Sequence, residues 1–169
     1  MEHFGQKVEV DGYKFDSKKE AQFYLQFIKP SGKRYEVHPH YRYAEKAAKD
    51  GVFLESRTYT PDFVVYENGN VLHMYDVKTS ISLYGMTKGA KDTIYWFQRL
   101  TPYWVELVVP RKHDFQMRLY GPTDRKLLDA HAMHDRQGNI KITSKGNVQF
   151  EYWNSYKDLN YDIHEFVGY

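Results

Sequence analysis

The chain contains no cysteine among its 169 residues. A disulfide framework, a thiolate nucleophile and a cysteine-ligated zinc or iron–sulfur cluster are therefore excluded, and several enzyme classes with them. No apolar run approaches the roughly 18 residues that a membrane-spanning helix needs, and the first residues lack the pattern of a secretory signal peptide. These absences predict a cytoplasmic protein that is not inserted in a membrane.

Charge of one sign is also scarce, because 24 basic residues stand against 22 acidic ones and leave a net charge of +2. Nucleic-acid-binding domains often carry a strongly basic balance, so any such surface here must be local. Aromatic residues, by contrast, make up 17% of the chain, with 16 tyrosines among them. This length and composition predict a single globular domain with an aromatic core and argue against disorder.

The first predicted element is a helix over residues 17–29. Ser17 can act as its N-cap, and Glu20 follows three residues later, as in a capping box. Apolar residues then recur at helical spacing. They are Ala21, Tyr24, Leu25 and Ile28. The run 30–32, Pro-Ser-Gly, predicts the end of the helix.

Strands are predicted next. Residues 34–43 alternate in polarity as a half-exposed strand does, and Pro39 indicates an edge or a bulge. Residues 44–55 form a charged excursion, for which a helical turn is predicted. The runs 58–66 and 71–78 are rich in strand-forming residues and flank an Asn-Gly turn signal, which predicts an antiparallel hairpin.

A second helix is predicted over residues 88–100 and a further strand over 103–109, so the elements follow the order α, β, β, β, α, β. Beyond residue 110 the pattern weakens, with a predicted helix over 122–135 and a hairpin over 137–153. We therefore expect a core of residues 1–110 and a C-terminal extension, a helix plus a hairpin over 111–169, of unknown role.

The chemistry is concentrated on the predicted hairpin. Asp62 lies in its first strand, whereas Asp76 and Lys78, two residues apart, share a face at the end of the second strand. Two carboxylates placed close together without a counter-ion repel each other, and one is driven to take up a proton. A hard divalent cation such as Mg²⁺ removes this conflict, so the pattern predicts a metal site.

This prediction places a condition on the hairpin register. A strict two-residue turn at residues 68–69 would put Asp62 opposite Tyr75 and leave Asp62 and Asp76 on opposite faces of the sheet. A loop with an odd number of residues, or one bulge, returns both carboxylates to one face. We therefore predict an odd loop or a bulge here.

Three motifs together resemble the PD-(D/E)XK nuclease superfamily and, within it, the small phage-type endonucleases that resolve DNA junctions. They are Asp16-Ser17-Lys18-Lys19-Glu20-Ala21, Tyr59-Thr60-Pro61-Asp62-Phe63 and Asp76-Val77-Lys78. With the order of elements, the resemblance covers roughly residues 13–109. It implies an α/β (α+β) fold of the restriction-endonuclease type, in which an αβββαβ core has a central mixed sheet flanked by helices and here carries the C-terminal extension.

The resemblance also implies roles for single residues. Asp62 and Asp76 would hold one or two Mg²⁺ or Mn²⁺ ions, with the carbonyl oxygen of Val77 as an extra ligand. Glu20 would be a further ligand, directly or through water. Lys78 would orient the attacking water, help to deprotonate it or stabilise the phosphate during hydrolysis. No nucleotide cofactor is implied, because the chain has no Gly-rich phosphate-binding loop.

Each residue also has an ordinary structural explanation. Glu20 is fully accounted for as the capping partner of Ser17. Four lysines near the ends of the two helices are candidates for DNA phosphate contacts, although solvated helix starts often carry lysine. They are Lys18, Lys19, Lys88 and Lys91. The pairs His38/His40 and His131/His134 have metal-ligand spacing, but neither has a clear third ligand.

These observations favour a hydrolase, a metal-dependent DNA endonuclease of phage or prophage origin that acts on branched or structured DNA in the host cytoplasm. The resemblance suggests a homodimer. The alternatives are a sequence-specific restriction or transposon-end nuclease on the same core, a nucleic-acid-binding module that does not cleave, and a structural phage protein. Base readout needs side chains in a groove of DNA, and no element for this can be identified.

Overall fold

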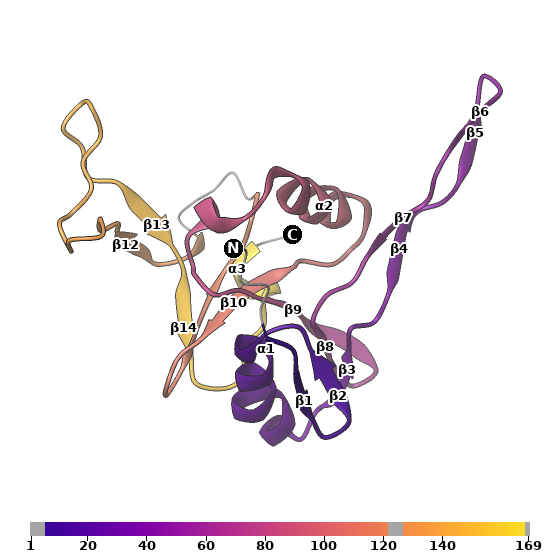
Figure 1. The fold of residues 1–169 in the computed structure, drawn as a ribbon, viewed down its shortest axis with the longest axis horizontal. Coiled ribbons are helices and arrows are strands. Elements are labelled where there is room, and N and C mark those ends of the chain that lie inside the picture. The colour runs from indigo at the N-terminus through magenta and orange to yellow at the C-terminus, as the bar shows by residue number, and fades with distance from the viewer. Residues whose placement is uncertain (1–5, 122–126, 168–169) are drawn as a thin grey trace.

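The computed structural model describes residues 6–121 and 127–167 (Figure 1). Its centre is a mixed sheet of six strands in the order β14-β11-β10-β9-β8-β3. The bounds of these strands are β3 (Arg34–Val37), β8 (Phe63–Glu67), β9 (Asn70–Val77), β10 (Glu106–Pro110), β11 (Phe115–Arg118) and β14 (Asn154–Tyr156). The predicted mixed α+β class with a central mixed sheet is confirmed. No helix within the described ranges is long and apolar enough to cross a membrane.

Helix α1 (Lys18–Phe23) begins as predicted, because the Ser17 hydroxyl accepts a hydrogen bond from the Glu20 N–H at 3.1 Å. The helix continues as a π-helical turn η1 (Tyr24–Ile28) and a 3₁₀ turn η2 (Lys29–Ser31), and it ends at Gly32 with φ 68°. The π-helical turn breaks the 3.6-residue spacing. Leu25, which the stripe placed in the core, is 47% exposed.

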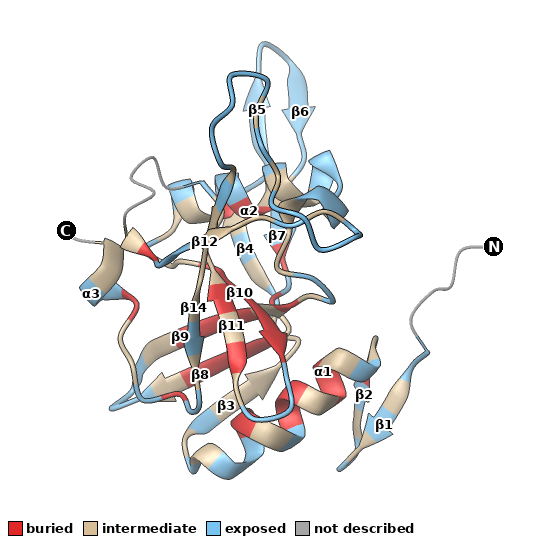
Figure 2. Ribbon diagram, turned by 90° about the vertical axis from the view of Figure 1, so that its left-hand side faces the viewer, coloured by how far each residue is buried: buried red, intermediate tan, exposed pale blue. Residues whose placement is uncertain are grey.

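The two faces of the sheet carry separate hydrophobic clusters. Alternate residues of β8 and β9, such as Phe63 and Tyr75, face α1, and Figure 2 shows the buried residues on these strands and on the inner side of α1. The residues between them, such as Val64 and Met74, face helix α2 (Lys88–Leu100). This helix has the predicted bounds, and α1 and α2 cover opposite faces of the sheet.

The predicted strand 34–43 is wrong as a single strand. It is interrupted after β3 and resumes as β4 (Tyr41–Ala44), and its partner is interrupted in the same way between β7 (Arg57–Tyr59) and β8. Pro39 and Pro61 lie within the two interruptions, where a proline has no backbone N–H to give to a sheet.

The pairing register is nevertheless the same on both sides of the interruption. Val37 lies opposite Phe63, and Tyr41 lies opposite Tyr59. β3–β8 and β4–β7 therefore form one long antiparallel ribbon that leaves the central sheet at the two prolines.

The predicted helical turn within residues 44–55 is also wrong, because this segment forms the hairpin of β5 (Ala47–Lys49) and β6 (Val52–Leu54). Asp50 and Gly51 have φ values of 50° and 78°, as a type I′ turn requires. The hairpin continues the ribbon and projects away from the rest of the molecule (Figure 1).

The predicted bulge is present in the β8–β9 hairpin. Val65 lies opposite His73, but Tyr66 lies opposite Val71, so Leu72 is an extra residue in β9. Beyond the bulge Val64 lies opposite Met74, and the same register places Asp62 level with Asp76 on one face. The register condition set by the two carboxylates is confirmed.

The C-terminal residues share the sheet and the core, since β11 and β14 extend the sheet beyond β10. The predicted helix over 122–135 is wrong where it can be compared: residues 130–132 form β12 (Ala130–Ala132), which pairs with β13 (Phe150–Tyr152), while 122–126 lie outside the described residues. The hairpin predicted over 137–153 has its turn at residues 143–147, where Ile142 pairs with Val148. The remaining elements are β1 (Val8–Val10), β2 (Tyr13–Phe15), η3 (Leu83–Gly85) and α3 (His164–Val167).

Candidate functional site

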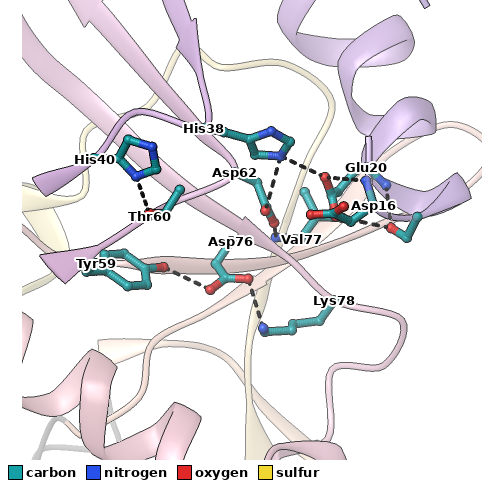
Figure 3. A network of polar contacts seen from close by, with 11 residues as sticks. Asp16, Glu20, His38, His40, Tyr59, Thr60, Asp62, Asp76, Val77 and Lys78 are labelled. Carbon is teal, nitrogen blue, oxygen red and sulfur yellow. Dashed lines mark hydrogen bonds and ion pairs between the residues drawn. The ribbon is translucent and has the colours of Figure 1, made fainter. Parts of the chain in front are cut away.

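A cluster of polar side chains lies where the long ribbon is interrupted. Figure 3 shows them pointing toward one another from the start of α1, from the residues after β3, from the residue before β8 and from the end of β9. Four of the cluster's residues are carboxylates: Asp16, Glu20, Asp62 and Asp76. The proline interruptions let these side chains meet, because the strands separate here instead of continuing as a regular sheet.

Asp62 and Asp76 share a face as a result of the bulge in β9. The Val77 N–H donates to Asp62 Oδ2 at 2.6 Å, and the Asp62 N–H donates to the carbonyl oxygen of Tyr75 at 2.9 Å. Asp62 is therefore held by the main chain of β9 at both its backbone and its side chain. This fixes the carboxylate beside the end of that strand.

Asp76 is held by two side chains. The Tyr59 hydroxyl donates to Asp76 Oδ2 at 2.8 Å, and Lys78 Nζ lies 2.8 Å from Oδ1. The Tyr59 ring packs on Phe97 of α2 with the ring centroids 4.8 Å apart. The orientation of the carboxylate is thereby tied to the packing of α2 on the sheet.

His38 joins the first helix to this carboxylate pair. Its Nε2 lies 3.1 Å from Glu20 Oε2 and 3.9 Å from Asp62 Oδ1. The residue has φ 51°, an uncommon value outside glycine, and its N–H donates to the carbonyl oxygen of Asp62 at 3.0 Å. Uncommon backbone conformations of this kind gather at functional sites.

The capping box is altered in a way that turns Glu20 toward the site. The Glu20 carboxylate accepts from the N–H of Asp16 at 3.3 Å and lies 3.1 Å from His38 Nε2, in place of bonding the N–H of Ser17. The side chain is only 8% exposed. Glu20 thus caps the helix and also contributes a buried carboxylate to the cluster.

The cluster carries more negative than positive charge. Burial, the Asp76 carboxylate and the Glu20 carboxylate raise the pKa of Asp62 well above its usual value, against the opposing effects of the Val77 N–H and Lys78. Burial and the charge of Asp76 also raise the pKa of Tyr59 well above its usual value, so the phenol stays a hydrogen-bond donor. Lys78 alone does not neutralise the four carboxylates of the cluster.

A divalent cation fits this arrangement. Ligand atoms of Asp16, Glu20 and His38 lie within 4.8 Å of one another, and the Asp62 and Asp76 carboxylates are the next acidic groups. Carboxylate oxygens suit Mg²⁺ and Mn²⁺, and an imidazole nitrogen is accepted by the transition metals. The excess of negative charge is the feature that a cation would relieve.

The comparison with known protein families agrees with the extent of this region. The model of DUF1064, a family described as proteins of unknown function, matches residues 2–108. The chain belongs to this family. No curated protein and no solved structure matches it. All the residues of the site lie within the range that matches DUF1064, whereas β11 and β14 lie outside it.

In this DUF1064 protein, the structure brings four of the predicted site residues together. They are Glu20, Asp62, Asp76 and Lys78. Val77 joins them through its N–H, which Asp62 accepts.

The predicted DNA-binding lysines lie apart from this cluster. Lys19 Nζ donates to the carbonyl oxygen of Pro110 at 3.0 Å and so links α1 to β10. Lys18 is exposed and borders a shallow groove beside Val8. Lys88 and Lys91 lie on the first turn of α2.

Three members of the site were not predicted from the sequence. Asp16 was assigned no role, Tyr59 was read only as part of a motif, and His38 was set aside because it lacked a third metal ligand. A signal for His38 does exist. Once residues 34–43 are paired with 58–66, the register places His38 level with Asp62, which also shows the missing acidic partners.

Proposed function

We propose that this protein is a metal-dependent endonuclease that hydrolyses phosphodiester bonds in DNA. One observation carries the proposal: Glu20, Asp62 and Asp76 lie in one polar cluster with the Lys78 amine, and the cluster has an excess of negative charge (Figure 3). Carboxylates that share a site without enough counter-charge are costly to maintain unless a cation or a catalytic role requires them.

Each residue of the cluster would have its own role in the hydrolysis. A divalent cation held by Asp62, Asp76 and Glu20 would act as a Lewis acid on a phosphoryl oxygen. The Lys78 amine, fixed by Asp76 Oδ1, is available to orient the attacking water and to stabilise negative charge on the phosphate. The Tyr59 hydroxyl holds the other oxygen of Asp76, so this carboxylate keeps one orientation during hydrolysis.

The order of the core elements supports the same proposal. Apart from the ribbon strands β4 to β7, which stand between β3 and β8, the chain runs α1, β3, β8, β9, α2, β10, and β9 runs parallel to β10. This is the αβββαβ order of the restriction-endonuclease-like fold that the sequence motifs resemble. The preference for branched DNA, the phage origin, the homodimer and the cytoplasmic location rest on the resemblance and are part of the proposal.

The test is cleavage of linear duplex, single-stranded, flap and four-way-junction DNA in Mg²⁺, Mn²⁺ or EDTA. We expect cleavage only with metal, and Asp76→Asn should reduce the rate by at least about 10²-fold, the scale of losing a positioned catalytic group. Asp129→Asn, an exposed carboxylate just before β12 and outside both the site and the groove beside α2, is the matched control and should cleave at the wild-type rate.

Intact DNA in every reaction, despite tight binding, would contradict the proposal and favour a module that binds without cleaving. Equal cleavage by the wild type and Asp76→Asn would also contradict it, because the activity would then come from another site or from a contaminant. The ranking of the four DNA substrates separates a junction-resolving enzyme from a general endonuclease.

A further inference from the structure

A groove lies between α2 and the base of the projecting ribbon. It has a volume of about 480 Å³, and its walls include Tyr43 and Arg57 from the ribbon and Asp92, Trp96 and Leu100 from α2. Trp96 is 49% exposed and Leu100 is 54% exposed. The site described above does not use any of these side chains.

We propose that this groove binds an unpaired segment of the DNA strand that the site cuts, with a backbone phosphate at Arg57 and a base stacked on Trp96. The inference rests on the proposed nuclease function and adds a substrate class to it. Proteins that bind single strands combine a cationic groove with exposed aromatic rings in this way.

Among the cations of the ribbon, Arg57 lines the groove, whereas Lys49 lies near the tip in β5. Arg42 pairs with Glu45 at 3.4 Å and Lys46 with Glu55 at 3.7 Å, so these two cations are already partnered. Arg57 is exposed and forms no ion pair with any residue that the structure describes. It is the groove's one basic wall residue in the described chain and is free to meet a phosphate.

Trp96 gives the groove its second feature. A half-exposed indole ring, next to Leu100 on the same helix, leaves a large apolar surface in contact with water. Asp92 is the one acidic wall residue, and Lys88 and Lys91 lie within one turn of it on α2. The helix therefore presents an aromatic ring next to a net positive charge, because two lysines stand against one aspartate.

The groove lies next to the site along β7. Arg57 and Tyr59 are two residues apart on one face of this strand, about 7 Å along it. Tyr59 donates to Asp76 and packs on Phe97 of α2, the helix that carries Asp92 and Trp96 of the groove. One strand and one helix therefore support both the site and the groove.

The dimensions favour an unpaired strand over a duplex. A volume of about 480 Å³ accommodates a nucleotide or two. Bases in a duplex are paired and stacked, so they cannot lie flat on Trp96 without being opened. Branched and flapped DNA supplies unpaired bases, which links the groove to the preference proposed for the site.

The test measures binding of a labelled 12-nucleotide oligo(dT) in EDTA, so that cleavage plays no part. We expect Trp96→Ala to weaken binding about 10-fold and Trp96→Phe to restore most of the loss, because stacking needs an aromatic face. Arg57→Ala should reduce the slope of log K against log salt concentration by about 0.7, the value for one phosphate contact on a single strand.

The matched controls are Phe150→Ala, which removes an aromatic ring of nearly equal exposure (48%) from β13, and Arg99→Ala, which removes an exposed cation from α2 outside the groove. Both should bind within about 2-fold of the wild type, a difference below 0.5 kcal/mol. Wild-type binding by Trp96→Ala would overturn the groove proposal.

Two other outcomes would also overturn it. If Trp96→Ala dissociates a wild-type dimer in sedimentation without changing oligo(dT) binding, the groove binds a second copy of the chain. If the variant weakens binding of duplex and single strand equally, the unpaired strand is not its ligand. A wild type that binds oligo(dT) through Trp96 but never cleaves DNA would contradict the nuclease alone.

Discussion

Two clusters of buried polar groups lie on this sheet, and they differ in how their charges are matched. In the first, His73 Nδ1 lies 2.8 Å from Glu106 Oε2, and both side chains are fully buried. His73 Nε2 lies 2.8 Å from the carbonyl oxygen of Leu159, and the Tyr161 hydroxyl donates to Glu106 Oε1 at 2.7 Å. One carboxylate thus meets one histidine, and every polar atom of the pair has a partner.

The second cluster is the candidate site, where Glu20, Asp62 and Asp76 share a single lysine and one histidine. Its side chains keep contact with solvent, with Asp76 14% and Lys78 29% exposed. The matched cluster has the properties of a group that stabilises the fold. The unmatched cluster has the properties of a group that is kept for a ligand, and the difference separates the two roles without reference to sequence motifs.

The largest effect is expected in the matched cluster. His73→Leu leaves the Glu106 carboxylate buried without its cation, which should lower the free energy of unfolding by about 3–5 kcal/mol in urea titrations. The double variant His73→Leu/Glu106→Leu should recover most of this loss, because no charge then remains buried. A loss below about 1 kcal/mol in the single variant would show that the pair contributes little.

The second largest effect is a gain in stability, which we expect when a divalent cation binds to the unmatched cluster. Mg²⁺ or Mn²⁺ at 100 times its dissociation constant should stabilise the wild type by about 2.7 kcal/mol, read as a rise in the thermal midpoint. Asp62→Asn should lose most of this gain, while His73→Leu/Glu106→Leu should keep it. Equal gains in all three proteins would mean that the cation binds elsewhere.

The smallest effect concerns pH. Burial alone would lower the pKa of His73, but the Glu106 carboxylate and the hydrogen bonds to Glu106 and Leu159 raise it above 6.5 overall. The protonated histidine therefore contributes its full stability below about pH 6.5 and loses it as the pH rises through the higher pKa of the folded state.

Thermal midpoints measured between pH 6 and pH 9 test this dependence. From pH 6 to pH 9, the thermal midpoint of the wild type should fall by about 2–4 °C relative to that of His73→Leu/Glu106→Leu. This corresponds to ~1 kcal/mol in the free energy of unfolding for a chain of this size. Parallel midpoints in the two proteins would contradict the proposed protonation of His73. If the thermal midpoint of the wild type instead rises with pH relative to the double variant, the pKa of His73 is lowered by folding and not raised.

Local patterns in the sequence predicted part of this fold. α2 has the predicted bounds because a capping threonine, a helical stripe and Pro102 all act within one segment. The bulge in β9 could be predicted because two carboxylates had to share a face. Pro39 indicated an irregularity, but the full break at Pro39 and Pro61 could not be predicted, since the ribbon keeps its register through the bend and the alternation of residues does not change.

The C-terminal third could not be derived for a different reason. β14 pairs with β11 across a long stretch of chain, and such non-local pairing leaves no signature in either segment alone. The same applies to the site. Asp16, His38 and Tyr59 look ordinary in the sequence, and only the folded arrangement of α1, β3 and β7 places them against the carboxylates.

The hydrogen bond between His73 and Leu159 joins residues 86 positions apart. This has a consequence for synthesis on the ribosome. Glu20, Asp62, Asp76 and Lys78 of the candidate site have all been translated by residue 78. The side of β9 that carries His73 and Tyr75, however, is not covered until Leu159 and Tyr161 have been added. Chains fold during synthesis, and exposed apolar strands promote aggregation. We therefore expect nascent chains that stall before residue 159 to depend on chaperones.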